Sequence, residues 1–105
     1  MNAVKSDVEK LVQKELESAN QKFPMFRSDH EGAAVIFEEI EEAEDELKSI
    51  KSVFEELWYT VKPNESNEPW VSRVMEYSVN LACEAIQIAA MAQKFIDSQK
   101  EREKS

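Results

Sequence analysis

A heptad of apolar residues runs through the middle of the chain and constrains the fold more than any other feature. Its members follow one another at alternating steps of four and three residues, as in a helix that packs lengthwise against another helix. They are Ile36, Ile40, Ala43, Leu47, Ile50, Phe54 and Leu57. Ser28 and Glu31 form an S-x-x-E capping box just before this run. We therefore predict one long helix over residues 29–61.

Two further helices are predicted, one on each side of this long helix. Apolar residues at helical spacing predict a helix over about residues 4–22, with Ser6 and Glu9 as its capping box. The segment KPNESNEP holds two of the three prolines and is the only obvious loop in the second half. Beyond this loop we predict a helix over residues 68–100, and then a frayed, charged tail over residues 100–105.

The third predicted helix is apolar on more than one side. Its first apolar line is Val71, Val74, Ser78, Leu81, Ala85, Ile88, Ala92 and Phe95, and its second is Met75, Val79, Ala82, Ile86, Ala89 and Ile96. Three helices in 105 residues cannot cover such a helix well. We therefore predict an all-α helical bundle of about three main helices in one domain, residues 1–105. A homodimer or homotetramer would complete its four-helix core.

The composition excludes several classes of partner. A formal net charge of -9 argues against binding a nucleic-acid polymer or an anionic membrane surface. It leaves phosphorylated small molecules open, because bound divalent cations can reverse the local sign. No run approaches the ~18 apolar residues that span a bilayer, and the charged N-terminus does not resemble a signal peptide. We expect a cytoplasmic protein, with its single cysteine, Cys83, as an inert thiol in the core.

An acidic run, EEIEEAEDE, occupies residues 38–46 of the long helix and places seven carboxylates in nine positions. At 100° per residue, part of this run points to solvent and part flanks the apolar seam. The solvent set is Glu38, Glu41 and Asp45, and the flanking set is Glu39, Glu42 and Glu46. The flanking set stands where a partner helix would meet it.

The third predicted helix supplies a polar line between its apolar lines. This line is Tyr77, Asn80, Glu84, Gln87, Met91 and Lys94, and it has the character of a cleft lining. Glu84 is costly to bury unless it is paired or ligated. Facing carboxylates on two helices would suit a hard cation such as Mg²⁺. The alternative is that Glu84 pairs with Lys94 or Arg73 or reaches solvent, while Glu39 and Glu42 are surface residues.

Antiparallel packing of the second and third helices would bring together residues that lie equally far from the loop. Counted from a loop centre near residue 65, Glu46 is level with Glu84, and Glu42 lies about one turn away. Glu46 is therefore an additional or substitute ligand for the cation.

Two stretches of this chain, HEGAAVIFEEIEEAEDEL and CEAIQIAAMAQKFI, resemble the MazG-like, all-α nucleotide pyrophosphohydrolases, in particular small phage and prophage-type members. That superfamily carries E-x-x-E on one helix and E-x-x-D on a later one, around Mg²⁺. Glu39 to Glu42 match the first element, and Glu84 to Gln87 stand where the second belongs. The resemblance covers about residues 28–97. Gln87 replaces the expected Asp and removes one anionic ligand, and the interval between the two elements is longer than is typical.

The resemblance implies metal-assisted attack of water at the α-phosphorus of a nucleoside triphosphate, with release of pyrophosphate. The cofactor would be Mg²⁺, or Mn²⁺ in its place, held by Glu39, Glu42 and Glu84. Glu38 would orient or deprotonate the water. The other expected site residues are Gln87 and Glu46 at the metal, and Lys94, His30 and Asn80 toward the substrate.

Several alternatives stay open. Lys94 is either a phosphate ligand or a solvated lysine near the end of its helix. His30 is either a substrate contact or a surface residue. The whole chain is either an enzyme or a non-catalytic MazG-like module that binds a nucleotide or a protein partner.

Overall fold

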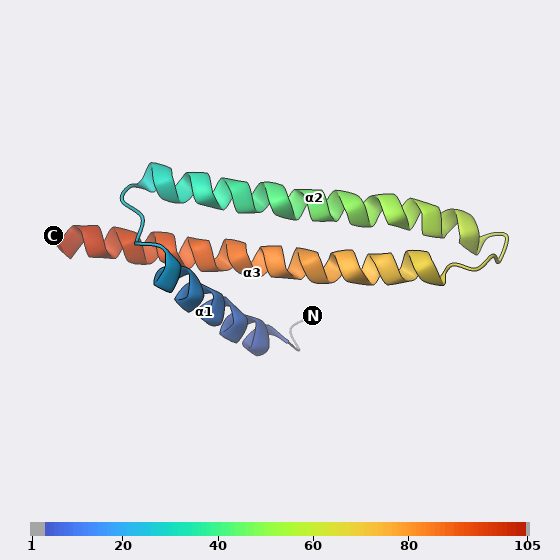
Figure 1. The fold of residues 1–105 in the computed structure, drawn as a ribbon, viewed down its shortest axis with the longest axis horizontal. Coiled ribbons are helices and arrows are strands. Elements are labelled where there is room, and N and C mark those ends of the chain that lie inside the picture. The colour runs from blue at the N-terminus through green and yellow to red at the C-terminus, as the bar shows by residue number, and fades with distance from the viewer. Residues whose placement is uncertain (1–3, 105) are drawn as a thin grey trace.

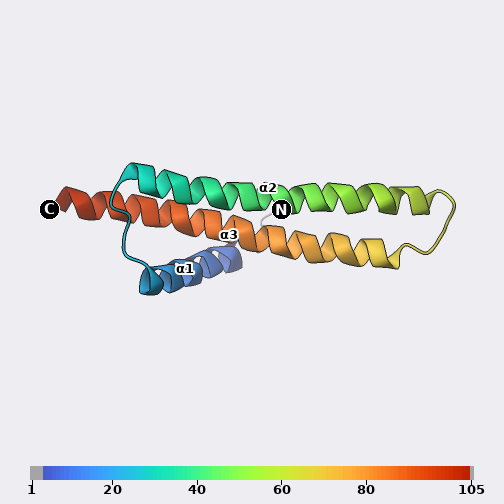
Figure 2. The same cartoon turned by 45° about the horizontal axis from the view of Figure 1, so that its top comes forward.

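Three helices make up the computed structural model, which describes residues 4–104 and has no strand among them. They are α1 (Lys5–Lys22), α2 (Asp29–Val61) and α3 (Glu68–Lys104). α2 and α3 lie side by side and antiparallel, and α1 packs against the C-terminal half of α3 (Figures 1 and 2). The molecule is elongated, at 65 × 28 × 23 Å. The prediction of an all-α bundle of three helices is confirmed.

Local hydrogen bonds define both ends of α2. At the start of α2, the Ser28 hydroxyl accepts a hydrogen bond from the Glu31 backbone N–H at 3.1 Å, as its capping box predicts. At the end of α2, Asn64 adopts a left-handed φ of 57°. The Asn64 and Glu65 N–H groups then donate to the carbonyls of Val61 and Thr60, at 3.1 and 3.0 Å. This Schellman pair satisfies carbonyls that the helix end would otherwise leave open.

Two expectations about helix ends are wrong. Ser6 and Glu9 do not form a capping box, because α1 already begins at Lys5, with Val4 at the N-cap and no side-chain cap. α3 runs to Lys104 and not to residue 100 as predicted. In the added turn, Arg102 bonds to the segment that joins α1 to α2.

The core lies at one end of the hairpin, where α1 adds a third helix. Its buried apolar residues are Leu16, Phe26 and Ala90. Gly32 is also buried. A Cβ atom at this position would lie 2.8 Å from Cε2 of Phe95 and 3.1 Å from Cδ2 of Phe26. The absence of a side chain at Gly32 therefore lets two aromatic rings approach the first turn of α2.

No helix within residues 4–104 is both long enough and apolar enough to cross a membrane. Cys83 is exposed in the single chain, so the prediction of a buried thiol is wrong. Cys83 lies within an apolar run of α3, but neither α1 nor α2 covers it. A sequence pattern shows which residues are apolar, not how many neighbours a helix has within one chain.

Candidate functional site

Three carboxylates from two helices meet halfway along the hairpin. Glu39 and Glu42 come from α2 and Glu84 from α3, and one oxygen of each lies within 4.8 Å of the others. The i, i+3 spacing puts the two α2 residues on one face, and antiparallel packing brings α3 across that face. We call these three residues the acidic cluster. They are the same three acids that the sequence analysis assigned to a metal.

Glu46 does not join the acidic cluster, although the count from the loop centre placed it level with Glu84. The reason is an asymmetric connection. α2 reaches further toward the loop than the start of α3 does, as Figure 1 shows, and residues 65–67 return without helical structure. The register of the hairpin is thereby shifted toward the start of α2. Glu84 lies opposite Glu39 and Glu42 as a result.

Gln87 lies one turn after Glu84 and contacts the acidic cluster through its side-chain amide. Oriented to satisfy its neighbours, the amide nitrogen donates to Oε2 of Glu39 at 2.7 Å and to Oε2 of Glu84 at 3.1 Å. Neither Lys94 nor Arg73 forms an ion pair with Glu84 within the described chain. Gln87 therefore supplies hydrogen bonds at the position where the E-x-x-D motif has a fourth carboxylate.

The environment of the acidic cluster favours protonation. Burial, followed by the hydrogen bond and charge of Glu42, raises the pKa of Glu84 to about 7. Burial and the Glu42 charge also raise the pKa of Glu39 above its ordinary value. Glu39 and Glu84 are thus each held near carboxylates that resist their ionisation. A cation, a proton or an amide N–H relieves the same repulsion, and Gln87 provides the last of these.

A cavity of about 460 Å³ opens next to the acidic cluster and shares Glu39 and Gln87 with it. Residues of all three helices and of the α1–α2 connector line it. α1 packs against α3 and not directly against α2, which leaves room between α1 and α2. The lining residues are Glu15, Ala19, Phe23, Pro24, Phe26, Glu31, Val35, Glu38, Glu39, Gln87, Met91 and Lys94. The cavity therefore combines apolar walls, four carboxylates and one lysine.

Lys94 is 1% exposed, so the alternative of a solvated lysine is wrong. Its Nζ lies 5.1 Å from the centroid of the Phe26 ring, a cation–π contact. Burial lowers the pKa of Lys94, and the negative charge of Glu31 partly opposes this effect. The chain thus keeps one buried ammonium group at the wall of the cavity.

The remaining predicted site residues lie in different places. Glu38 lines the cavity beside Glu39, and its side chain is also exposed to solvent. His30 and Asn80 are exposed and do not line the cavity. Glu46 is half-buried and outside the acidic cluster. The structure therefore brings together Glu38, Glu39, Glu42, Glu84, Gln87 and Lys94, and leaves the other three apart.

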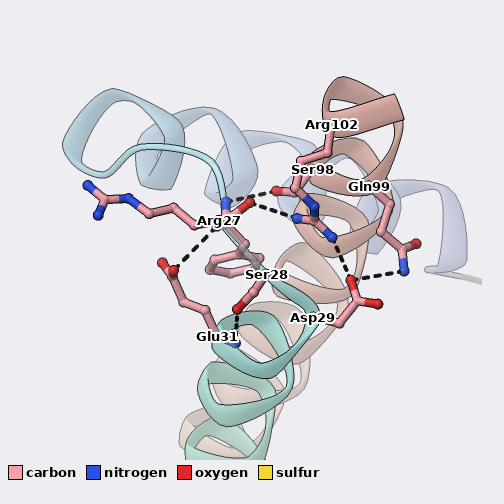
Figure 3. Close-up of polar contacts among 8 residues, drawn as sticks. Arg27, Ser28, Asp29, Glu31, Ser98, Gln99 and Arg102 are labelled. Carbon is pink, nitrogen blue, oxygen red and sulfur yellow. Dashed lines mark hydrogen bonds and ion pairs between the residues drawn. The ribbon is translucent and has the colours of Figure 1, made fainter. Parts of the chain in front are cut away.

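A network of polar contacts fixes the connector that forms one wall of the cavity (Figure 3). The Phe26 N–H donates to the Ser98 hydroxyl at 2.9 Å, and Arg102 donates to the Phe26 carbonyl at 2.8 Å. Arg102 also pairs with Asp29 at 2.5 Å. The end of α3 thereby holds Phe26 over Lys94. No sequence pattern singled out Phe26, Ser98 or Arg102, although Ala90, Lys94 and Ser98 follow one another at steps of four residues on one side of α3.

Comparison of this chain with known protein families, with curated proteins and with solved structures finds no match. The case for a function therefore depends on the residues of the acidic cluster and of the cavity.

Proposed function

We propose that the protein is a divalent-metal-dependent nucleoside triphosphate pyrophosphohydrolase, as its resemblance to the MazG-like superfamily suggests. One observation supports this proposal above the others: Glu39, Glu42 and Glu84 converge from two antiparallel helices, next to a cavity of about 460 Å³. Carboxylate oxygens are the ligands that Mg²⁺ prefers, and this ion is usually held by a few carboxylates together with substrate phosphates. Ligand pockets in proteins commonly have volumes of about 300–1,000 Å³.

In this proposal, the acidic cluster holds Mg²⁺ or Mn²⁺, which would polarise water and neutralise the triphosphate. Glu38 lies at the cavity beside Glu39 and orients or deprotonates the attacking water. Gln87 positions Glu39 and Glu84 through its amide. When a cation is bound, its amide oxygen is the atom suited to face the metal.

A second candidate function has a specific observation in its favour. The Gln87 amide donates to two of the three carboxylates, and so holds them together without a cation. A chain that lost its fourth acid and its chemistry would keep such an arrangement. This candidate is a non-catalytic module that binds a nucleotide or a protein partner.

The two candidates predict different responses to Mg²⁺. In the enzyme, millimolar Mg²⁺ raises the melting temperature, because a ligand bound only by the native state stabilises it by ~2.7 kcal/mol at 100 times its Kd. Glu39→Gln and Glu84→Gln each abolish this rise and the release of pyrophosphate from a mixture of dNTPs. The control Glu41→Gln, on the exposed side of the acidic run, retains both. Gln87→Asp tightens Mg²⁺ binding.

Equal behaviour of the three glutamate variants would refute the metal assignment. A rise in melting temperature without pyrophosphate release, even at high protein concentration, would favour the non-catalytic module.

We place the protein in the cytoplasm, as a homodimer or homotetramer. Support for the oligomer comes from the apolar side chains that the single chain leaves exposed on α2 and α3.

A further inference from the structure

Lys94 is a buried cation that lacks an ordinary partner. It is 1% exposed, yet no hydrogen bond or ion pair reaches its ammonium group from the described residues. The face of the Phe26 ring lies near it, and the charge of Glu31 acts on it from beyond ion-pair distance. No fully buried side-chain nitrogen or oxygen among the described residues lacks a partner, so the Lys94 ammonium keeps a small accessible area, and this area faces the cavity that it lines. Because Lys94 lines the cavity, a ligand in the cavity is in a position to supply a hydrogen-bond acceptor.

The charges around the cavity determine which kind of acceptor fits. Lys94 is the one cation among its described lining residues, and it shares the cavity with Glu15, Glu31, Glu38 and Glu39. Two like charges 4 Å apart repel by about 4 kcal/mol at an effective dielectric constant of 20. A phosphate held at Lys94 would meet this repulsion from several carboxylates. A neutral carbonyl oxygen accepts from the Lys94 ammonium without it.

The walls of the cavity indicate the shape of the ligand. Phe23, Phe26 and Met91 contribute aromatic and thioether surface, which packs well against a flat ring. The carboxylates at the same cavity accept hydrogen bonds from N–H groups. A flat, uncharged ring with a carbonyl oxygen next to a ring N–H matches the donor, the acceptors and the walls together.

We propose that the cavity binds a nucleotide base that carries a carbonyl next to a ring N–H, and that Lys94 selects it by donating a hydrogen bond to that carbonyl. The identification of the ring as a nucleobase rests on the proposed function, whereas the preference for a neutral keto ring rests on the cavity alone. The cavity shares Glu39 and Gln87 with the acidic cluster, so the phosphates of the same nucleotide would extend from the base toward that cluster. Lys94 is then a specificity-determining residue and not a phosphate ligand.

Uncharged nucleosides test this proposal without phosphate and without metal. Deoxyuridine carries a carbonyl and an N–H where deoxycytidine carries an amino group and a bare ring nitrogen. We expect deoxyuridine to bind at least tenfold more tightly than deoxycytidine in EDTA, as measured by calorimetry or by NMR titration. Lys94→Met should weaken deoxyuridine binding at least tenfold and remove the preference. The matched control is Lys100→Met, which replaces an exposed lysine of α3 and should leave both affinities unchanged.

Thermal unfolding separates loss of the site from loss of the fold. Lys94→Met removes a buried charge, so its melting temperature should be equal to or above that of the parent protein. Equal affinity for the two nucleosides, or no binding of either at millimolar concentration, would overturn the proposal. So would a Lys94→Met variant that loses pyrophosphate affinity and keeps nucleoside affinity, because Lys94 would then be a phosphate ligand. Selective binding of deoxyuridine without any pyrophosphohydrolase activity would support the base site and contradict the enzyme.

Discussion

The two ends of the α2–α3 hairpin differ in how well their apolar side chains are covered. Where α1 packs, Leu16, Phe26 and Ala90 are only 5%, 6% and 0% exposed. Toward the loop, Phe54 and Trp58 are 51% and 64% exposed, although they come from an equally regular part of the same helix pair. Their rings contact each other, with centroids 6.4 Å apart, and the rest of their surface meets solvent.

This difference shows what a third helix adds to a pair. No residue between positions 33 and 89 is buried, although the apolar pattern continues through most of that range. A helix in a pair presents one face to its partner and leaves its other apolar face uncovered. α1 encloses one end, and both the cavity and the buried Lys94 lie there. The loop end has the same kind of surface without a cover.

Several of the uncovered apolar side chains follow one line on each helix. On α2 these are Ile40, Leu47 and Phe54, which are members of the predicted heptad seam, together with Trp58, and on α3 they are Val71, Met75 and Val79. We call these seven residues the apolar face. Single exposed apolar residues are ordinary, but a line of this length on each of two packed helices is typical of an interaction surface.

The largest effect that we predict concerns this apolar face. Light scattering at micromolar concentration should show a particle of at least twice the 12.1 kDa chain mass. Met75→Glu places a charge at a position that is 66% exposed in the single chain and should return the particle to one chain mass. Ser52→Glu is the control, because Ser52 is exposed and lies about 160° around the helix from Phe54. A parent protein of one chain mass would contradict the prediction.

The second prediction compares core residues at the two ends. Leu16→Ala removes a side chain that is 5% exposed and should lower the free energy of unfolding by about 2–5 kcal/mol. Phe54→Ala removes a larger side chain that is half exposed, and in the dilute monomer its cost should be below ~1.5 kcal/mol. Denaturant unfolding at low protein concentration measures both values. Equal losses would mean that α1 does not create the core that its contacts suggest.

The sequence was sufficient to predict the fold because the signals were local and periodic. The heptad seam and the Ser28 capping box define α2, and the bounds predicted for it agree with the structure. The register was harder to predict, because it depends on the shape of a six-residue loop. Asn64 turns the chain in a left-handed conformation, and the extended residues after it shift α3 toward the start of α2. Glu46 was predicted as a metal ligand because the sequence does not show this shift in register.

The candidate site was predicted in part, for a related reason. Glu39, Glu42 and Glu84 stand out because carboxylates beside an apolar seam conflict with burial. Lys94 was also identified, but its burial was not, because burial depends on how α1 crosses α3. The contacts of Ser98 and Arg102 with the connector join residues more than 70 positions apart. No local pattern shows such contacts.

The third prediction tests how the covered end is held together. Arg102→Ala removes the hydrogen bond to the Phe26 carbonyl and the ion pair to Asp29. Because the guanidinium is about a third exposed, the loss should be about 1 kcal/mol and not the 1.5–3 kcal/mol of a fully buried charged bond. Lys104→Ala, an exposed residue at the end of the same helix, is the control and should be neutral. A neutral Arg102→Ala would show that the end of α3 does not hold the connector.

The smallest effect is expected from the partly solvated Glu84. Its substitution should raise stability, whereas Leu16→Ala and Arg102→Ala should lower it. Its pKa is raised from 4.5 to about 7 in the folded chain, so the folded state binds the proton more tightly than the unfolded state does. The resulting stabilisation is complete below pH 4.5 and is lost as the pH rises through 7.

Glu84→Gln removes this titration and keeps an acceptor for the Gln87 amide. In EDTA, the variant should therefore melt a few degrees above the parent protein at pH 8, with the gap closing by pH 5. Glu41→Gln should follow the parent protein at both values. A Glu84→Gln variant that melts below the parent protein at pH 8 would mean that the carboxylate stabilises the hairpin without any cation. The acidic cluster would then be a structural contact between the helices, and the difference between the two ends of the hairpin would concern packing alone.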